Sequence, residues 1–210
     1  MQYNYIAIEG NIGSGKTSFA KMLSEDLDAQ LLLEQFEDNP FLANFYKDPD
    51  RYSFQVEMSF LTERYYHLKK ELINKDIFQP LTISDYFINK CQIFGSSNLK
   101  DDELKLFNAL FSIINTALPK PDLIVYLYVH PENLIYNISK RGRKYEEEIK
   151  QEYLSKIHQG YFEHFKQLKN SRILIVDTNN VDFVNKKSDY NRLKKVVTSE
   201  IPIGITREIL

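Results

Sequence analysis

Short apolar runs recur along this chain, and longer segments with helical spacing separate them. Five runs have the length and the apolar character of buried parallel strands, at residues 5–8, 30–33, 81–83, 123–129 and 173–176. Four of the five are followed by helix-like segments. This βαβ rhythm predicts an α/β fold of three layers, with a five-stranded parallel sheet between two layers of helices.

Apolar residues spaced three or four positions apart predict the helices. The first helix starts at about Lys16, a long helix covers residues 50–73, another includes residues 104–114, and a last one covers residues 185–198. There is no internal repeat, linker or low-complexity stretch, so we expect a single domain over residues 1–210. The long helical segments before and after the third strand leave room for a substrate pocket.

The composition excludes several classes of protein. The net charge is −2, so no overall positive field attracts nucleic acid. Cys91 is the only cysteine, which rules out an intrachain disulfide and indicates a reducing compartment. No apolar run reaches the roughly 18 residues of a membrane-spanning helix. We expect a cytoplasmic protein that binds neither nucleic acid nor a membrane. The histidines show no metal-ligand spacing, and His158 and His164 are expected to face solvent.

A glycine-rich motif follows the first predicted strand and opens the first helix. It matches the pattern G-x-x-x-x-G-K-[ST] in full, with the residues Gly10, Asn11, Ile12, Gly13, Ser14, Gly15, Lys16 and Thr17. In this context several backbone N–H groups point toward one place, where the positive end of the helix dipole also lies. The lysine can reach the β and γ phosphates, and the threonine hydroxyl can ligate Mg²⁺. The motif predicts a nucleoside triphosphate site; the alternative is a flexible surface turn.

Two acidic residues follow predicted strands, at the edge of the sheet where ligands bind. Glu34 follows the second strand, which we expect beside the first, and its carboxylate could take a proton from a hydroxyl group. The alternative is a solvated loop glutamate. Asp85 closes the third strand, within Ser84-Asp85-Tyr86. It either supports Mg²⁺ or the acceptor, or it caps a helix.

Charged residues on the helices offer further candidates. Arg141 and Arg143 flank Gly142 in a basic segment that could close as a lid over transferred phosphate, because arginine forks match phosphoryl oxygens. Three glutamates, beginning with Glu146, follow at once, and at least two of them should be structural. Glu57 and Arg64 share one face of the long helix, two turns apart. They either flank an acceptor pocket or form part of a surface ion-pair pattern.

Together these residues resemble the deoxynucleoside kinases, P-loop enzymes that phosphorylate the 5′-hydroxyl of deoxynucleosides. The resemblance runs through residues 9–17, 34–42, 45–49, 52–54, 121–127 and 141–143. It implies ATP and Mg²⁺ as cofactors, a homodimer, Glu34 as general base, and Arg141 and Arg143 as lid arginines. It also implies that residues 177–183, with Asn180, Asp182 and Phe183, surround the donor's adenine, and that Phe45, Tyr46, Glu57, Arg64 and Glu146 bind the acceptor.

The chain departs from this family at two places. Glu57 stands where the family has a base-reading glutamine; an ionised glutamate only accepts hydrogen bonds, which suits the two adjacent N–H donors of guanine. The arginine that usually follows the third strand is absent. Without it a cation near the acceptor hydroxyl is missing, unless Lys90 or Arg64 takes its place. Such a contact is worth about 2.7–4 kcal/mol in a transition state, so weak or altered catalysis is one expectation.

The sequence therefore predicts a deoxynucleoside kinase that transfers the γ-phosphate of ATP to a deoxynucleoside, with purines favoured. A nucleoside monophosphate kinase of the thymidylate type is one alternative, although Glu34 and the missing arginine oppose it. A nucleotide-binding regulator with weakened catalysis is another. The altered end of the third strand favours this regulator, whereas the intact Lys16, Thr17 and lid arginines oppose it.

Overall fold

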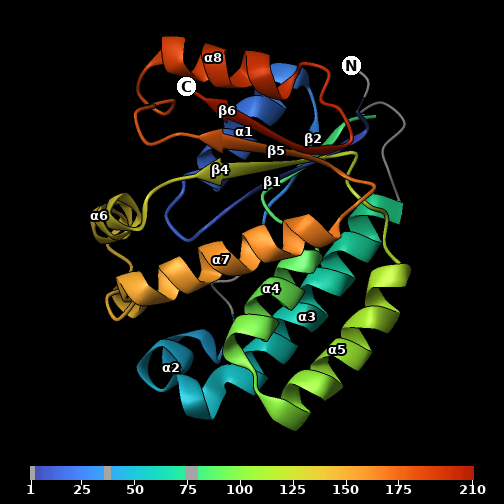
Figure 1. Cartoon of the computed structure of the whole chain (residues 1–210), viewed down its shortest axis with the longest axis vertical. Coiled ribbons are helices and arrows are strands. Elements are labelled where there is room, and N and C mark those ends of the chain that lie inside the picture. The colour runs from blue at the N-terminus through green and yellow to red at the C-terminus, as the bar shows by residue number, and fades with distance from the viewer. Residues whose placement is uncertain (1–2, 36–38, 74–79) are drawn as a thin grey trace.

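A parallel β-sheet forms the middle layer of the molecule (Figure 1). The computed structural model describes residues 3–35, 39–73 and 80–210; Phe36, Glu37 and Asp38, which belong to one of the family-like segments, lie outside the described residues. In these ranges the sheet has six strands in the order β2-β3-β1-β4-β5-β6. Their bounds are β1 Tyr5–Gly10, β2 Gln30–Leu32, β3 Thr82–Ser84, β4 Leu123–Tyr128, β5 Arg172–Asp177 and β6 Gly204–Ile209.

Two features of the sheet correct the sequence prediction. The expected five strands become six, because β6 pairs in parallel with β5. This strand lies at an edge and is largely exposed, with three polar residues between Ile205 and Ile209, so it has no continuous apolar run. The strand before Glu34, β2, was expected beside β1. Instead β3 lies between them and pairs with both. The connection through α1 carries the chain two places along the sheet.

The expected helices are present. They are α1 Lys16–Leu27, α3 Pro49–Ile73, α5 Asp101–Thr116 and α8 Lys187–Val197, and the predicted start at Lys16 is confirmed. The described residues also form α2 Leu42–Lys47, α4 Asn89–Asn98, α6 Pro131–Arg141, α7 Gln151–Gln167 and the short 3-10 helix η1 Lys144–Glu146. None of the helices in these ranges has the length and apolarity needed to cross a membrane.

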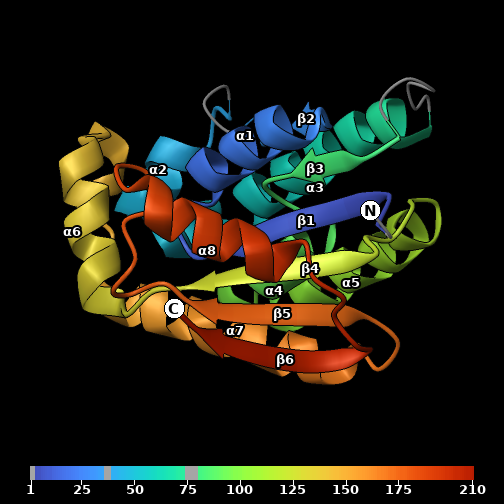
Figure 2. The ribbon, with the colours of Figure 1, turned by 90° about the horizontal axis from the view of Figure 1, so that it is seen from above.

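The helices divide between the two faces of the sheet. Figure 1 shows α1 and α8 on one face and α7, α4, α3 and α5 on the other. From above, Figure 2 shows α6 beside the ends to which β1 and β4 point. All strands run parallel, so their carboxyl ends meet at this edge, which is where ligands bind in open α/β sheets.

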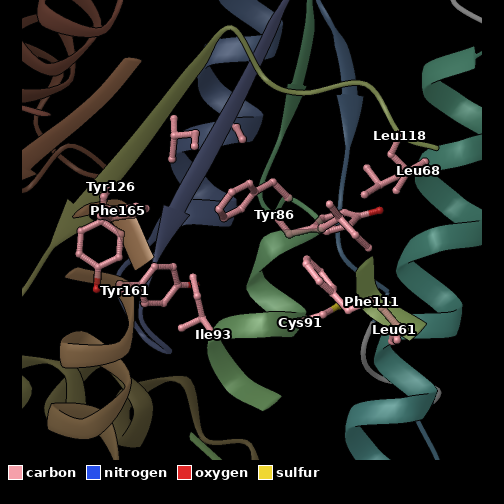
Figure 3. Close-up of a cluster of buried hydrophobic side chains, with 14 of the residues drawn as sticks. Leu61, Leu68, Tyr86, Cys91, Ile93, Phe111, Leu118, Tyr126, Tyr161 and Phe165 are labelled. Carbon is pink, nitrogen blue, oxygen red and sulfur yellow. The ribbon is translucent and has the colours of Figure 1, made fainter. Parts of the chain in front are cut away.

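Each face of the sheet has its own core. Phe19 and Leu23 of α1 pack with Leu193 of α8 on one face. On the other face, the ring centroids of Tyr126 of β4 and Tyr161 of α7 are 4.8 Å apart, and both side chains are fully buried (Figure 3). The long aromatic side chains fill the space between the sheet and several helices. They contribute most of the apolar area that fixes α7 and α4 over the sheet.

The expectation that His158 and His164 face solvent is wrong. Both lie on α7 and are buried, because this helix packs lengthwise against the sheet. The His158 ring lies between the Tyr126 hydroxyl, 2.6 Å from Nδ1, and the carbonyl of Val129, 2.9 Å from Nε2. It satisfies two buried polar groups and has a structural role.

Candidate functional site

The glycine-rich segment between β1 and α1 forms a cradle of backbone N–H groups. Gly13 and Gly15 have φ values of 83° and 84°, a region that residues with a side chain rarely adopt. A Cβ on Gly15 would also lie 2.8 Å from the Phe183 ring. The Ser14 hydroxyl is buried and has no hydrogen-bond partner in the described part of the chain. Free donors at a helix N-terminus suit the oxygens of a phosphate group.

Lys16 and Asn11, two residues of this loop, have different roles. Residues 12–17 line a large cavity, and the Lys16 ammonium is 3.4 Å from the carbonyl oxygen of Asn11. Burial, and secondarily the charge of Lys90, lowers the pKa of Lys16 to about 8. The Asn11 side chain instead donates to the carbonyl of Leu154 at 2.8 Å. Asn11 therefore ties the loop to α7, whereas Lys16 is available to a ligand.

Thr17 and Asp85 form a pair of oxygen ligands beside the cradle. The Thr17 hydroxyl donates to Asp85 Oδ2 at 2.5 Å, and the backbone N–H of Glu34 donates to Oδ1 at 2.7 Å. A hydroxyl and a carboxylate suit Mg²⁺, which usually keeps few protein ligands and completes its shell with water and substrate phosphates. The described residues contain no cluster of three His, Cys, Asp or Glu side chains that could hold a metal.

Glu34 lies between two buried cations. Arg64 Nη2 is 2.5 Å from Oε1 and Lys90 Nζ is 2.5 Å from Oε2, and all three side chains are at most 7% exposed. Burial alone would raise the pKa of Glu34, but Arg64, Lys90 and Lys16 together lower it below its usual range. The carboxylate is therefore ionised at neutral pH, and Arg64 belongs to this buried cluster rather than to a surface pattern.

Glu57 lies two turns before Arg64 on α3 and lines the same cavity. Its Oε1 accepts a hydrogen bond of 2.7 Å from the side-chain nitrogen of Asn98, at the end of α4. Its Oε2 is buried and unpartnered among the residues that the structure describes. Burial is the main cause that raises the pKa of Glu57 to about 7, against the opposing effects of Asn98 and Arg64.

The two lid arginines converge on one acid. Arg141, the last residue of α6, has its Nη2 2.5 Å from Glu146 Oε2, and Arg143 Nη1 is 3.5 Å from Oε1. Of the three consecutive glutamates only Glu146 is buried. Both arginines line the cavity. Glu146 thus holds the two cations at the cavity mouth, where a phosphate could replace it as their partner.

The remaining predicted residues lie at the two ends of the cavity. Phe45 and Tyr46 of α2 line the end near Glu57, and Phe183 and Asp182 line the end near the cradle. Phe183 packs edge-on against Phe19, with ring centroids 5.7 Å apart. Asn180 is exposed and does not line the cavity; its neighbour Asn179 does.

One cavity joins all of these groups. Its volume of about 1110 Å³ exceeds the usual range for a single drug-sized ligand, so it has room for two bound molecules. The cradle and the Thr17–Asp85 pair lie together at one end, whereas the lid arginines and Glu146 lie next to Tyr46 of α2. Glu57 lies at the other end, and the Glu34 cluster stands between the two ends. This arrangement suits group transfer from a phosphate donor to a second molecule.

Comparison with known proteins gives consistent matches over most of the chain. Residues 6–202 match the family model for deoxynucleoside kinase. Deoxyguanosine kinase of Bacillus subtilis (strain 168) is 38% identical over 197 residues, covering 90% of this chain and 93% of the relative. Deoxyadenosine kinase of Dictyostelium discoideum is 30% identical over 201 residues, covering 95% and 80%. A structure of deoxyadenosine kinase from M. mycoides, with dCMP and dCDP bound, has a TM-score of 0.80 at 27% identity and covers 93% of this chain and 100% of that one.

The buried carboxyl of Glu57 should make stability depend on pH in a way that one substitution removes. Its pKa in the folded chain is about 7, above the value in the unfolded chain, so its contribution to stability is lost as pH rises from about 5 to above 7. We expect Glu57→Gln to become more stable relative to the unchanged chain over this range, by up to about 3 kcal/mol. Urea unfolding at several pH values measures the difference. The exposed Glu152→Gln should show no such trend, and a flat Glu57→Gln difference would contradict the assignment.

Proposed function

The chain belongs to the deoxynucleoside kinase family, and is thus a phosphotransferase; from that premise we propose that it transfers the γ-phosphate of ATP to the 5′-hydroxyl of a purine deoxynucleoside, deoxyguanosine above all. The observation that carries the proposal is the position of Glu34. An ionised carboxylate stands midway along a cavity that has a phosphate cradle at one end and a base-sized pocket at the other.

The donor end of the cavity supplies the groups that bind a triphosphate. The cradle N–H groups and Lys16 hold the phosphate oxygens, and Arg141 and Arg143 exchange Glu146 for the transferred phosphoryl group. Thr17 and Asp85 would hold Mg²⁺, which neutralises charge on the β and γ phosphates when it is bound. The adenine lies against the 177–183 segment, with Phe183 and Asp182 on the cavity wall.

Glu34 orients the acceptor hydroxyl and takes its proton. Its lowered pKa makes it a weak base, but phosphoryl transfer has a loose transition state in which the proton leaves late. Oε2 accepts from Lys90 alone, so its second lone pair can accept the hydroxyl hydrogen. Lys90 is the more mobile partner, since Arg64 also contacts the Cys91 sulfur at 3.1 Å and lies over the Phe60 ring. Lys90 is then available to the transferred phosphoryl group, in place of the arginine missing after β3.

Glu57 gives the preference for guanine. Glu57 lines the cavity, and its unpartnered Oε2 together with the remaining lone pair of Oε1 would give a base two adjacent acceptors, which match the N1–H and N2–H donors of guanine. The relative from Bacillus subtilis, named a deoxyguanosine kinase, agrees with this preference. A base without two adjacent donors would leave the buried acceptors unsatisfied, which costs about 1–3 kcal/mol.

The proposed assembly is a homodimer that pairs through α3 and α5. Four large apolar side chains on these two contacting helices are exposed: Tyr66 and Ile73 of α3, and Leu106 and Ile113 of α5. We infer that these side chains form one apolar patch, because an exposed patch of this kind marks an interaction surface.

Replacing Glu34 by glutamine should abolish most of the kinase activity. The amide keeps the size but cannot take a proton, so kcat for deoxyguanosine should fall about 10²- to 10⁴-fold. A coupled assay of ADP release with the four deoxynucleosides and their monophosphates measures this. The unchanged chain should prefer deoxyguanosine. Faster turnover of thymidine monophosphate, or an active Glu34→Gln variant, would contradict the proposal.

The role of Lys90 is tested by a pair of substitutions. Lys90→Met keeps the length of the side chain and removes the charge, so kcat should fall about 10²- to 10³-fold while KM for deoxyguanosine changes less. Lys90→Arg restores a cation and should recover most of kcat. Lys105→Met, on the surface of α5, is the matched control. Equal losses in Lys90→Met and Lys90→Arg would indicate a packing role instead.

The dimer surface can be tested without touching the cavity. Ile113→Glu places a charge in the α3–α5 patch and should convert the dimer into a monomer in sedimentation equilibrium. Ile209→Glu changes an equally exposed isoleucine on the edge strand β6 and should leave the dimer intact. A monomeric unchanged chain, or dissociation by Ile209→Glu alone, would contradict this interface.

A further inference from the structure

Asn98 determines which oxygen of Glu57 can carry a proton. Its Nδ2 donates to Glu57 Oε1 at 2.7 Å and to the Tyr153 hydroxyl at 3.3 Å. An amide nitrogen has only donors, so Oε1 must remain an acceptor. When Glu57 binds a proton, that proton therefore lies on Oε2, which is buried and has no partner among the residues described.

The two protonation states of Glu57 present different patterns to the cavity. The ionised carboxylate offers two acceptors, which match the N1–H and N2–H groups of guanine. The protonated carboxyl offers a donor at Oε2 and an acceptor at Oε1, which is the pattern of a glutamine amide. Adenine presents the complement of that pattern, an acceptor at N1 beside the N–H donors at N6.

We propose that Glu57 reads both purines, guanine when it is ionised and adenine when it is protonated, and that Asn98 is the positioning residue that keeps the proton on Oε2. This inference rests on the proposed function and adds to it the rule by which the site chooses its base. Selectivity between the two deoxynucleosides then depends on a single proton in the pocket.

The surroundings of Glu57 make both states accessible near neutral pH. Burial favours the protonated form most strongly. Asn98 and Lys90 face Glu57 from α4, and Tyr153 faces it from α7. Arg64 lies on α3 itself, and Glu34 follows the end of β2. The two cations and the Asn98 hydrogen bond favour the ionised form, while Glu34 opposes it. The opposing influences leave the pKa of Glu57 at about 7.

The proposal predicts how selectivity changes with pH. The kcat/KM for deoxyguanosine follows the ionised fraction of Glu57, and the value for deoxyadenosine follows the protonated fraction. Their ratio then rises about ten-fold for each pH unit. Every step that the two substrates share, including proton transfer to Glu34 and ATP binding, cancels in this ratio.

A competition assay measures the ratio directly. Both deoxynucleosides are supplied together with ATP and Mg²⁺, and the two monophosphates are quantified between about pH 6 and about pH 8. We expect the ratio of deoxyguanosine to deoxyadenosine product to rise up to about 100-fold over this range. Glu57→Gln cannot titrate, so its ratio should favour deoxyadenosine and stay constant with pH.

Two further variants separate the role of Asn98 from packing. Asn98→Leu removes the hydrogen bond that lowers the pKa of Glu57, so the midpoint of the deoxyguanosine profile should move to higher pH. Ser97→Ala, at the adjacent position of α4, should leave this midpoint unchanged. An unshifted midpoint in Asn98→Leu overturns the role of Asn98.

The outcomes for the unchanged chain distinguish the two levels of the argument. If both purines are phosphorylated and their ratio does not change with pH, the inference is overturned while the proposed function stands. If neither is phosphorylated, both are overturned. A rising ratio in the unchanged chain, together with a constant ratio in Glu57→Gln, supports the inference.

Discussion

The charge balance around Glu34 is the constraint on which the cavity depends. A lone carboxylate buried to this degree would be protonated, because burial disfavours charge. Arg64 and Lys90 keep it ionised, and the three groups together hold the end of β2 against α3 and α4. An ionised acceptor at the middle of the cavity is what an attacking hydroxyl needs. Under the proposed function, the two cations are part of the reaction site as well as of the fold.

The parallel sheet explains how residues so far apart in sequence reach one cavity. The segments after β1, β2 and β3 leave the same edge of the sheet, which brings Thr17, Glu34 and Asp85 into one hydrogen-bonded row. The helices α3 and α4, on the lower face in Figure 1, supply further side chains to the cavity wall, among them Glu57 and Lys90. Because α3 and α4 pack against each other, Asn98 can bond to Glu57 across 41 positions of the chain.

The sequence predicted the parts of the structure that have local signals. The strand–loop–helix around the cradle and the long helix α3 follow from motif and periodicity. The edge strand β6 is largely exposed and gave no apolar run. Glu9 was also missed as a buried acid: it accepts from Tyr161 at 2.7 Å and from the Phe87 N–H at 2.9 Å. No local pattern announces such partners, since they come together only when α7 and α4 pack on the sheet. The same is true of Asn98, whereas Lys90 stood out from the sequence because an arginine was missing.

A crystal structure of the chain with deoxyguanosine, Mg²⁺ and a non-hydrolysable ATP analogue tests the central claim most directly. Our account places the 5′-oxygen of the sugar within hydrogen-bond distance of Glu34 Oε2, about 2.6–3.2 Å, with Lys90 turned toward the terminal phosphate in the cradle. A sugar bound elsewhere would contradict it, and so would a Glu34 carboxylate that still pairs with both Arg64 and Lys90 when nucleotide is bound.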